Sequence, residues 1–274
     1  MNGISVNRIW KLMRLELLFH WKYYVMLTIG SFFLLATFFF YVWNKFSAYW
    51  DLWDWRDQTF LGYLMAYKIL LVFLVYGNAF FDLRSKANSE RYLLIPASNW
   101  EKLLSQLFIK IGLAEIILPL VFWLSANFAS LIWVNFLQEI FHPENLAEFQ
   151  LIGIGIIWPF PPDQNWAIYL LMLGIYLVLI SIFFAGNLYF GKWNLVLTPV
   201  SLFIFYLIIT SSSVGLSQLL FTKDESILSF NISINEPEIF TDVPLMVLVI
   251  IFLLFLGSAL SYLVAYYRLK EREV

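Results

Sequence analysis

Six long apolar stretches, separated by charged segments, constrain this chain more than any other feature of its sequence. A bilayer hydrocarbon core about 30 Å thick is crossed by roughly 20 apolar helical residues. Only 13% of the residues are charged and 61% are hydrophobic, whereas about a quarter of the residues in a water-soluble protein are charged. The sequence therefore predicts an all-α membrane protein and excludes a soluble enzyme or a nucleic-acid-binding domain.

We expect one transmembrane domain, residues 1–274, with six transmembrane helices. The spans are predicted at residues 23–42, 59–81, 103–134, 166–190, 199–221 and 243–266. The third stretch is too long for one perpendicular crossing, so we expect it to tilt or to protrude into the cytoplasm.

The basic residues predict the orientation of these spans. With the N-terminus inside, thirteen of the 17 Lys and Arg residues fall in cytoplasmic segments, and only Lys45, Arg56 and Lys223 fall outside. Cytoplasmic loops of membrane proteins carry such an excess of basic residues. We therefore expect both termini in the cytoplasm and residues 135–165 and 222–242 on the extracytoplasmic side of a bacterial inner membrane.

The segment before the first span has helical periodicity. One broad apolar face is formed by Ile9, Trp10, Leu12, Met13 and Leu17, opposite Arg8, Lys11 and Arg14. This pattern predicts an amphipathic interfacial helix within residues 1–22, with its basic face towards anionic lipid headgroups. The same pattern also fits a plain cytoplasmic extension of the first span.

The connection between spans two and three, residues 82–98, is the most charged segment that faces the cytoplasm. Its candidate contact residues are Arg84, Lys86, Glu90, Arg91 and Tyr92. Pro96 disfavours helix just before it, and Ser98 with Glu101 forms a capping box for the next helix. A short helix at about residues 85–94 could dock a partner, and an ordinary charged loop is the alternative.

Two ionisable residues, Lys68 and Glu115, lie inside apolar stretches of consecutive spans. An unpaired charge at membrane depth costs about 2.5–3.5 kcal/mol even on the lenient insertion scale, so their opposite signs predict an intramembrane ion pair. Pro119 lies four residues after Glu115 and cannot donate to the Glu115 carbonyl, so we expect a kink there. The pair could belong to a proton or substrate pathway, or it could be structural.

No catalytic or metal-binding constellation is visible in the sequence. The two histidines, His20 and His142, fall on opposite sides of the membrane, cysteine is absent, and no H-E-x-x-H, G-x-S-x-G or P-loop motif occurs. We therefore predict no catalytic residue, no metal site and no cofactor. If ATP drives this protein, another subunit binds the ATP.

Two motifs resemble those of a known family. The run Phe80–Phe81–Asp82–Leu83, followed by Tyr92–Leu93–Leu94–Ile95–Pro96–Ala97–Ser98–Asn99–Trp100–Glu101–Lys102, resembles a "yLxLPAS-x-x-EK" segment of Bacteroidetes permease-like proteins. The turn Phe190–Gly191–Lys192–Trp193–Asn194 is similar to an F-K-K-type turn in the same group. Together with six spans and a basic entry helix, the chain resembles the permease subunit of type-2 ABC exporters.

This resemblance implies a function. Residues 7–18 would be a connecting helix, and residues 85–94 a coupling helix that inserts into a separate ABC ATPase. A second permease subunit, identical or paralogous, and two ATPase chains would complete an exporter. The competing hypothesis is a non-transporting scaffold or assembly factor that binds an extracytoplasmic protein. An intramembrane enzyme is a third hypothesis.

Overall fold

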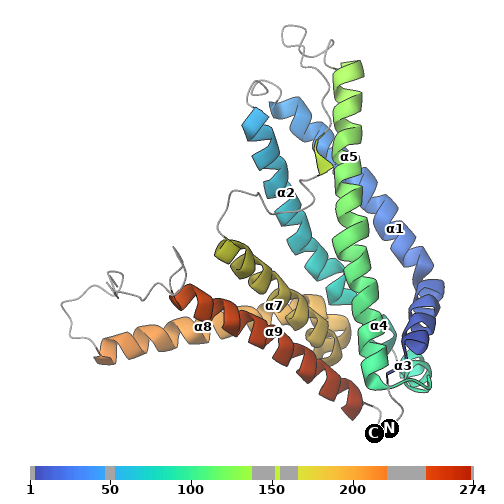
Figure 1. The fold of residues 1–274 in the computed structure, drawn as a ribbon, viewed down its shortest axis with the longest axis vertical. Coiled ribbons are helices and arrows are strands. Elements are labelled where there is room, and N and C mark those ends of the chain that lie inside the picture. The colour runs from blue at the N-terminus through green and yellow to red at the C-terminus, as the bar shows by residue number, and fades with distance from the viewer. Residues whose placement is uncertain are drawn as a thin grey trace. The chain divides into compact units, whose positions relative to one another are not determined.

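Most of the described residues of this chain are helical (Figure 1), and no strand occurs among them. The computed structural model describes residues 4–46, 53–84, 86–137, 152–154, 166–220 and 245–272. Five continuous helical stretches are long and apolar enough to cross a membrane, namely Val6–Lys45, Phe60–Asn78, Asn99–Phe136, Trp166–Ser212 and Val247–Glu271. These five stretches define a multi-pass membrane protein.

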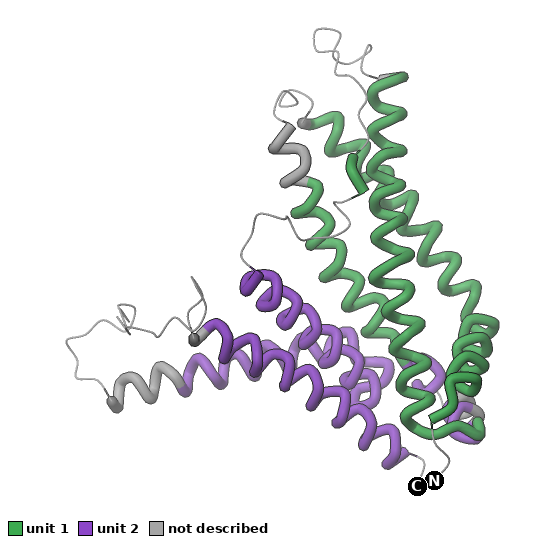
Figure 2. The backbone as a smooth tube through the Cα atoms, in the orientation of Figure 1, with its two compact units in different colours: residues 1–79, 95–162 green, residues 80–94, 163–274 purple. Residues whose placement is uncertain are grey.

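The contacts divide the chain into two compact units (Figure 2). Unit 1 comprises residues 1–79 and 95–162, and unit 2 comprises residues 80–94 and 163–274. The segment between the second and third apolar helices, which the sequence predicts to be cytoplasmic, therefore belongs to unit 2, although both helices beside it in sequence belong to unit 1.

Unit 1 begins with α1, Val6–Phe46, a helix of 41 residues. The sequence predicts an interfacial helix followed by a separate span, whereas the structure joins the two at a kink. The kink lies at His20, whose backbone angles (φ −110°, ψ 15°) are not helical. The kink thus falls close to the predicted boundary between the interfacial helix and the span.

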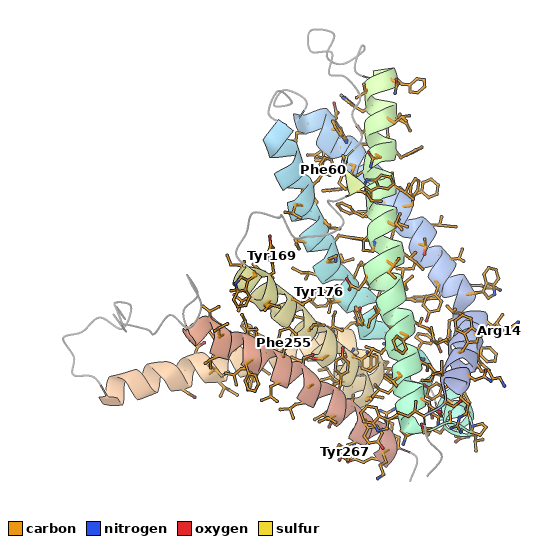
Figure 3. The ribbon with its side chains drawn as sticks, viewed as in Figure 1. Arg14, Phe60, Tyr169, Tyr176, Phe255 and Tyr267 are labelled. Carbon is orange, nitrogen blue, oxygen red and sulfur yellow. The ribbon has the colours of Figure 1, made fainter. Side chains whose placement is uncertain are left out.

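The apolar face predicted for the interfacial helix is partly buried and partly exposed in the structure. Ile9 and Leu12 are buried within the protein, whereas Trp10 and Leu17 are exposed. The basic side chain of Arg14 extends from α1 on the side away from α4 (Figure 3). One part of the predicted lipid-facing surface therefore packs against protein. The sequence does not indicate this burial, because hydropathy does not distinguish a lipid from a protein environment.

The remaining helices of unit 1 are α2 (Trp53–Leu74), the short η2 (Tyr76–Asn78), and a long composite helix. The composite helix consists of α4 (Asn99–Ile111), the π-helical η4 (Gly112–Ile117), α5 (Leu118–Ile132) and the π-helical η5 (Trp133–Leu137). Aromatic side chains fill the core between α1, α2 and α5. Phe39 is fully buried there, with ring centroids 5.2 Å from Phe60 and 5.0 Å from Phe122.

The composite helix is longer than the membrane is thick. Its apolar stretch, Asn99–Phe136, has 38 residues and is about 57 Å long at 1.5 Å per residue. The hydrocarbon core of a bilayer is only about 30 Å thick. The α4 end carries the buried polar residues Glu101, Lys102, Gln106 and Lys110. We infer that this end protrudes from the hydrocarbon, as the length of the third predicted span suggests.

Unit 2 contains three long helices, α7 (Trp166–Phe190), α8 (Asn194–Leu220) and α9 (Leu245–Glu271), and the short η3 (Phe81–Arg84), α3 (Lys86–Leu93) and η7 (Gly191–Trp193). Helices α7 and α9 pack on each other around Ala167 and Ile251. A Cβ atom added to Gly174 would lie 3.1 Å from Leu254 Cβ, so the glycine allows a close approach of the two helices.

Helix α8 begins earlier than the sequence predicts. Thr198 and Pro199 suggest a cap and a first-turn proline, but the helix begins at Asn194 and contains Pro199. The chain reverses at Gly191, whose φ of 54° suits glycine, and passes through η7 directly into α8. The hydroxyls of Thr210 and Ser211 donate to carbonyls four residues earlier, so both hydroxyls are bonded within α8.

Most of the predicted extracytoplasmic segments 135–165 and 222–242 lie outside the described residues. One described part, residues 152–154, is attached to α5. Trp123 Nε1 donates to the Ile152 carbonyl at 2.7 Å, and the Ile152 amide donates to Asn127 Oδ1 at 2.8 Å. The chain after α5 therefore returns to that helix at Ile152.

Candidate functional site

The predicted coupling segment contains a helix in the structure. Helix α3 spans eight residues, Lys86–Leu93, close to the predicted range of 85–94. An isolated helix of this length is not stable in water, so α3 depends on tertiary contacts. Those contacts come from unit 2, mainly through the adjacent residues of η3 and its flanks.

Two of the five candidate contact residues face the interior of unit 2. The Arg84 guanidinium donates to Asn187 Oδ1 at 3.1 Å and lies 5.3 Å from the Phe81 ring centroid. Tyr92 is 7% exposed, with its ring centroid 6.5 Å from that of Phe80. Both side chains therefore anchor the segment, and the sequence alone does not reveal this inward orientation.

The other three candidates lie on α3 itself. Glu90 is exposed, while the side chains of Lys86 and Arg91 lie outside the described part of the structure. Leu94, just beyond the helix, is 81% exposed. The available contact surface of the segment is thus α3 with Leu94.

Residues from three distant parts of unit 2 meet beside this segment. Arg272 donates to the carbonyls of Leu188, at 2.6 Å, and Leu83, at 3.4 Å. Leu188 lies in the last turn of α7, where carbonyls have no partner within the helix. Burial lowers the pKa of Arg272, and the positive charge of nearby Arg268 lowers it further.

The predicted intramembrane residues lie together in unit 1. Lys68 Nζ is 3.2 Å from Glu115 Oε2, and the Tyr76 hydroxyl donates to Glu115 Oε1 at 3.3 Å. The two charged side chains are 13% and 25% exposed, and Tyr76 is fully buried. The structure thus brings Lys68 and Glu115 together and adds Tyr76, whose separation from both in sequence hides this contact.

Both charged residues are far from the ends of their helices. Lys68 lies eight residues after Phe60 and ten before Asn78, the bounds of that apolar stretch. Glu115 lies within the π-helical η4, in which the Leu118 amide bonds to the Leu113 carbonyl five residues earlier. We predicted a kink at this point; the π turn accommodates Pro119, which has no amide proton, by shifting the hydrogen-bond register.

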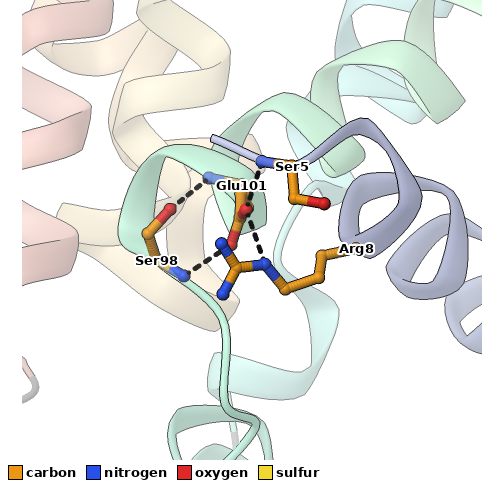
Figure 4. Close-up of polar contacts among 4 residues, drawn as sticks. All are labelled: Ser5, Arg8, Ser98 and Glu101. Atoms are coloured by element: carbon orange, nitrogen blue, oxygen red, sulfur yellow. Dashed lines mark hydrogen bonds and ion pairs between the residues drawn. The ribbon is translucent and has the colours of Figure 1, made fainter. Parts of the chain in front are cut away.

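A second ionic site, at the base of α4, holds α1 in unit 1 (Figure 4). The capping box is confirmed: the Glu101 amide donates to Ser98 Oγ, and the Ser98 amide donates to Glu101 Oε2. The same carboxylate accepts the Ser5 amide at 2.8 Å and lies 3.0 Å from Arg8 Nε. One side chain therefore caps α4 and fixes the start of α1.

The environment of Glu101 favours its charged form. Burial alone would raise the pKa of this carboxyl, but hydrogen bonds from the Ser5 and Ser98 amides and the charge of Arg8 outweigh burial and lower it. Glu101 precedes the predicted span that begins at residue 103. The ionised carboxylate can therefore hold both helix starts at neutral pH.

A row of buried polar contacts joins α1 to α4 and was not predicted from the sequence. Lys110 Nζ donates to the Tyr24 hydroxyl at 2.9 Å, and that hydroxyl donates to Glu16 Oε1 at 3.1 Å. All three side chains are nine-tenths or more buried. The signal was present as polar residues four apart on one helical face, at positions 102, 106 and 110.

No protein-family model, curated protein or solved structure matches this chain. The class of protein therefore rests on its apolar helices, which define a multi-pass membrane protein.

Proposed function

We propose that this chain is the permease subunit of an ATP-driven ABC transporter, an exporter of the bacterial inner membrane, and that it works with a separate ATPase subunit. One observation carries the proposal. A short charged helix, α3, lies between two apolar helices in sequence, and buried polar and aromatic contacts attach it to unit 2. A fixed helix with an exposed charged side chain is suited to binding another protein.

The proposal includes six spans with both termini in the cytoplasm. The 47-residue apolar stretch Trp166–Ser212 contains all of α7 and most of α8. At 1.5 Å per residue, α7 and α8 are about 37 Å and about 40 Å long, so each is sufficient for one crossing. The glycine turn at Gly191 supports two separate spans. With two spans here, α3, η7 and the C-terminus would lie on the same side of the membrane.

A second permease subunit, identical or paralogous, and membrane lipids complete the proposed assembly. The described face of α8 supports both, because its apolar side chains remain exposed within unit 2, for example Phe203 at 61%, Phe205 at 60% and Tyr206 at 63%. Such a helix suits a hydrocarbon environment or another transmembrane helix.

The function is tested by purifying the tagged full-length chain from its native membranes. We expect an ABC ATPase to co-purify. Replacing both Lys86 and Arg91 by Glu should reduce the retained ATPase about tenfold or more, because like charges across an interface are strongly unfavourable. Arg84 is left unchanged, since its guanidinium bonds within unit 2.

Lys22→Glu with Lys270→Glu is the matched control, because it introduces the same charge change at two exposed positions outside α3. Equal loss of ATPase from both double variants would remove α3 from the docking role. Recovery of an extracytoplasmic protein without any ATPase would contradict the permease proposal and favour the scaffold, whose partner would bind the segment near Ile152.

A further inference from the structure

The basic C-terminal end of α9 makes contacts that have no part in the proposed binding of the ATPase. We propose that Arg272 and Arg84 are positioning residues that form a clasp, which fixes η3 and α3 to the inner ends of α7 and α9. The clasp makes α3 a rigid part of unit 2. Its existence is independent of the proposed function; its role in transmitting movement from a partner rests on that function.

The polar part of the clasp joins three segments. The Asn187 amide nitrogen donates to the Phe183 carbonyl at 3.0 Å, which directs Asn187 Oδ1 towards Arg84. Arg272 spans the Leu188 and Leu83 carbonyls. Since both arginines are cations at the carbonyl end of α7, the helix dipole strengthens these hydrogen bonds.

The clasp also has an apolar part, formed by aromatic side chains of η3's preceding residue, α7 and α9. The ring centroids of Phe80 and Phe184 are 5.1 Å apart, and those of Phe184 and Tyr262 are 5.8 Å apart. Phe80 and Phe184 are 2% and 0% exposed. Two edge-to-face ring contacts therefore link the start of the segment to α7 and, through α7, to α9.

The two chain connections between this segment and unit 1 are not helical. Phe80 has a φ of 51°, an uncommon conformation for a bulky residue, and separates η2 from η3. On the other side, residues 95–98 are not helical, and the Ala97 amide bonds to the Ile95 carbonyl in a tight turn. No helix continues from α2 or α4 into α3, so the buried contacts within unit 2 determine which helices move with α3.

Hydrogen–deuterium exchange of the full-length chain in lipid nanodiscs tests the clasp without any partner. Arg272→Ala and Arg84→Ala should each accelerate amide exchange of residues 86–93 about tenfold or more, because each removes charge-assisted hydrogen bonds. Exchange of residues 99–111 should stay unchanged. In the double variant, exchange should be faster than in either single variant. The acceleration should be smaller than the product of the two single accelerations, because both arginines act through one assembly.

Lys270→Ala is the matched control, since it removes the same charge from the same end of α9 at an exposed position. Unchanged exchange at residues 86–93 in both arginine variants, or an equal rise in the control, would overturn the clasp. A rise that extends equally to residues 99–111 would also overturn it, because that pattern means general unfolding.

Spin labels at Glu90→Cys and Lys192→Cys provide a second measurement within unit 2. The chain has no native cysteine, so only these sites react. We expect a narrow distance distribution with Arg272 intact and a broad one in Arg272→Ala; equal widths would contradict a rigid α3. Absence of an ATPase partner would defeat the proposed function and leave both of these results standing.

Discussion

Replacing Glu115 by Gln, or Lys68 by Met, is expected to reduce the yield of folded protein severely, whereas the double replacement recovers most of it. The side chains are 3.2 Å apart and largely withdrawn from solvent, so either single change leaves one charge without its opposite partner. Breaking a buried ion pair in this way costs about 3–5 kcal/mol, while replacing both members is often close to neutral. Folded yield in detergent and thermal stability in nanodiscs are the measurements.

Two variants serve as controls for the ion pair. Tyr76→Phe removes one hydrogen bond to Glu115 but keeps both charges, so its cost should be only about 1 kcal/mol. Lys22→Met removes an exposed charge and should have almost no effect. If the losses of Lys68→Met and Glu115→Gln simply add in the double variant, the two residues do not stabilise each other.

The second large effect is expected at Gly186, where α7 meets the start of α8. A Cβ atom there would collide with Asn194 Oδ1 and Thr198 Oγ1, both on buried side chains. Asn194 cannot turn aside freely, because its amide nitrogen donates to the Phe183 carbonyl at 3.0 Å. Gly186→Ala should therefore lower the free energy of unfolding by about 1–3 kcal/mol, as overpacking of a close contact usually does.

Gly257→Ala is the matched control for this glycine. A Cβ atom at Gly257 meets nothing within 4 Å, and the residue lies inside α9. Alanine there should raise stability by up to about 1 kcal/mol through helix propensity. Thermal unfolding of both variants in nanodiscs decides the matter. A shift of the same sign and size in both would show that no close α7–α8 contact exists at Gly186.

Hydropathy and charge predicted much of this architecture from the sequence. The apolar helices lie close to the predicted stretches, and the capping box at Ser98 and Glu101 forms as its spacing indicates. The opposite charges of Lys68 and Glu115 are adjacent in space. Each of these features follows from segment length, from local spacing, or from the high cost of an unpaired charge in lipid.

The features that sequence reasoning missed depend on contacts between distant residues. Neither spacing nor hydropathy indicates that Arg84 bonds to Asn187, or that Arg272 reaches Leu83. The buried positions of Ile9 and Leu12 were also missed, because an apolar side chain can face lipid or protein equally well. Assigning residues 80–94 to unit 2 likewise requires the tertiary contacts.

In the proposed topology, the chain crosses the inner membrane six times and presents α3 on the cytoplasmic side. Because the chain contains no cysteine, single cysteines report their exposure without background. With an impermeant thiol reagent in intact cells, Ser89→Cys, Lys192→Cys and Glu271→Cys should be protected, and Asn145→Cys and Ser226→Cys should react. Labelling at Ser89 would contradict this topology. Protection at Ser226 would also contradict it, because that result is expected if α7 and α8 together cross the membrane only once.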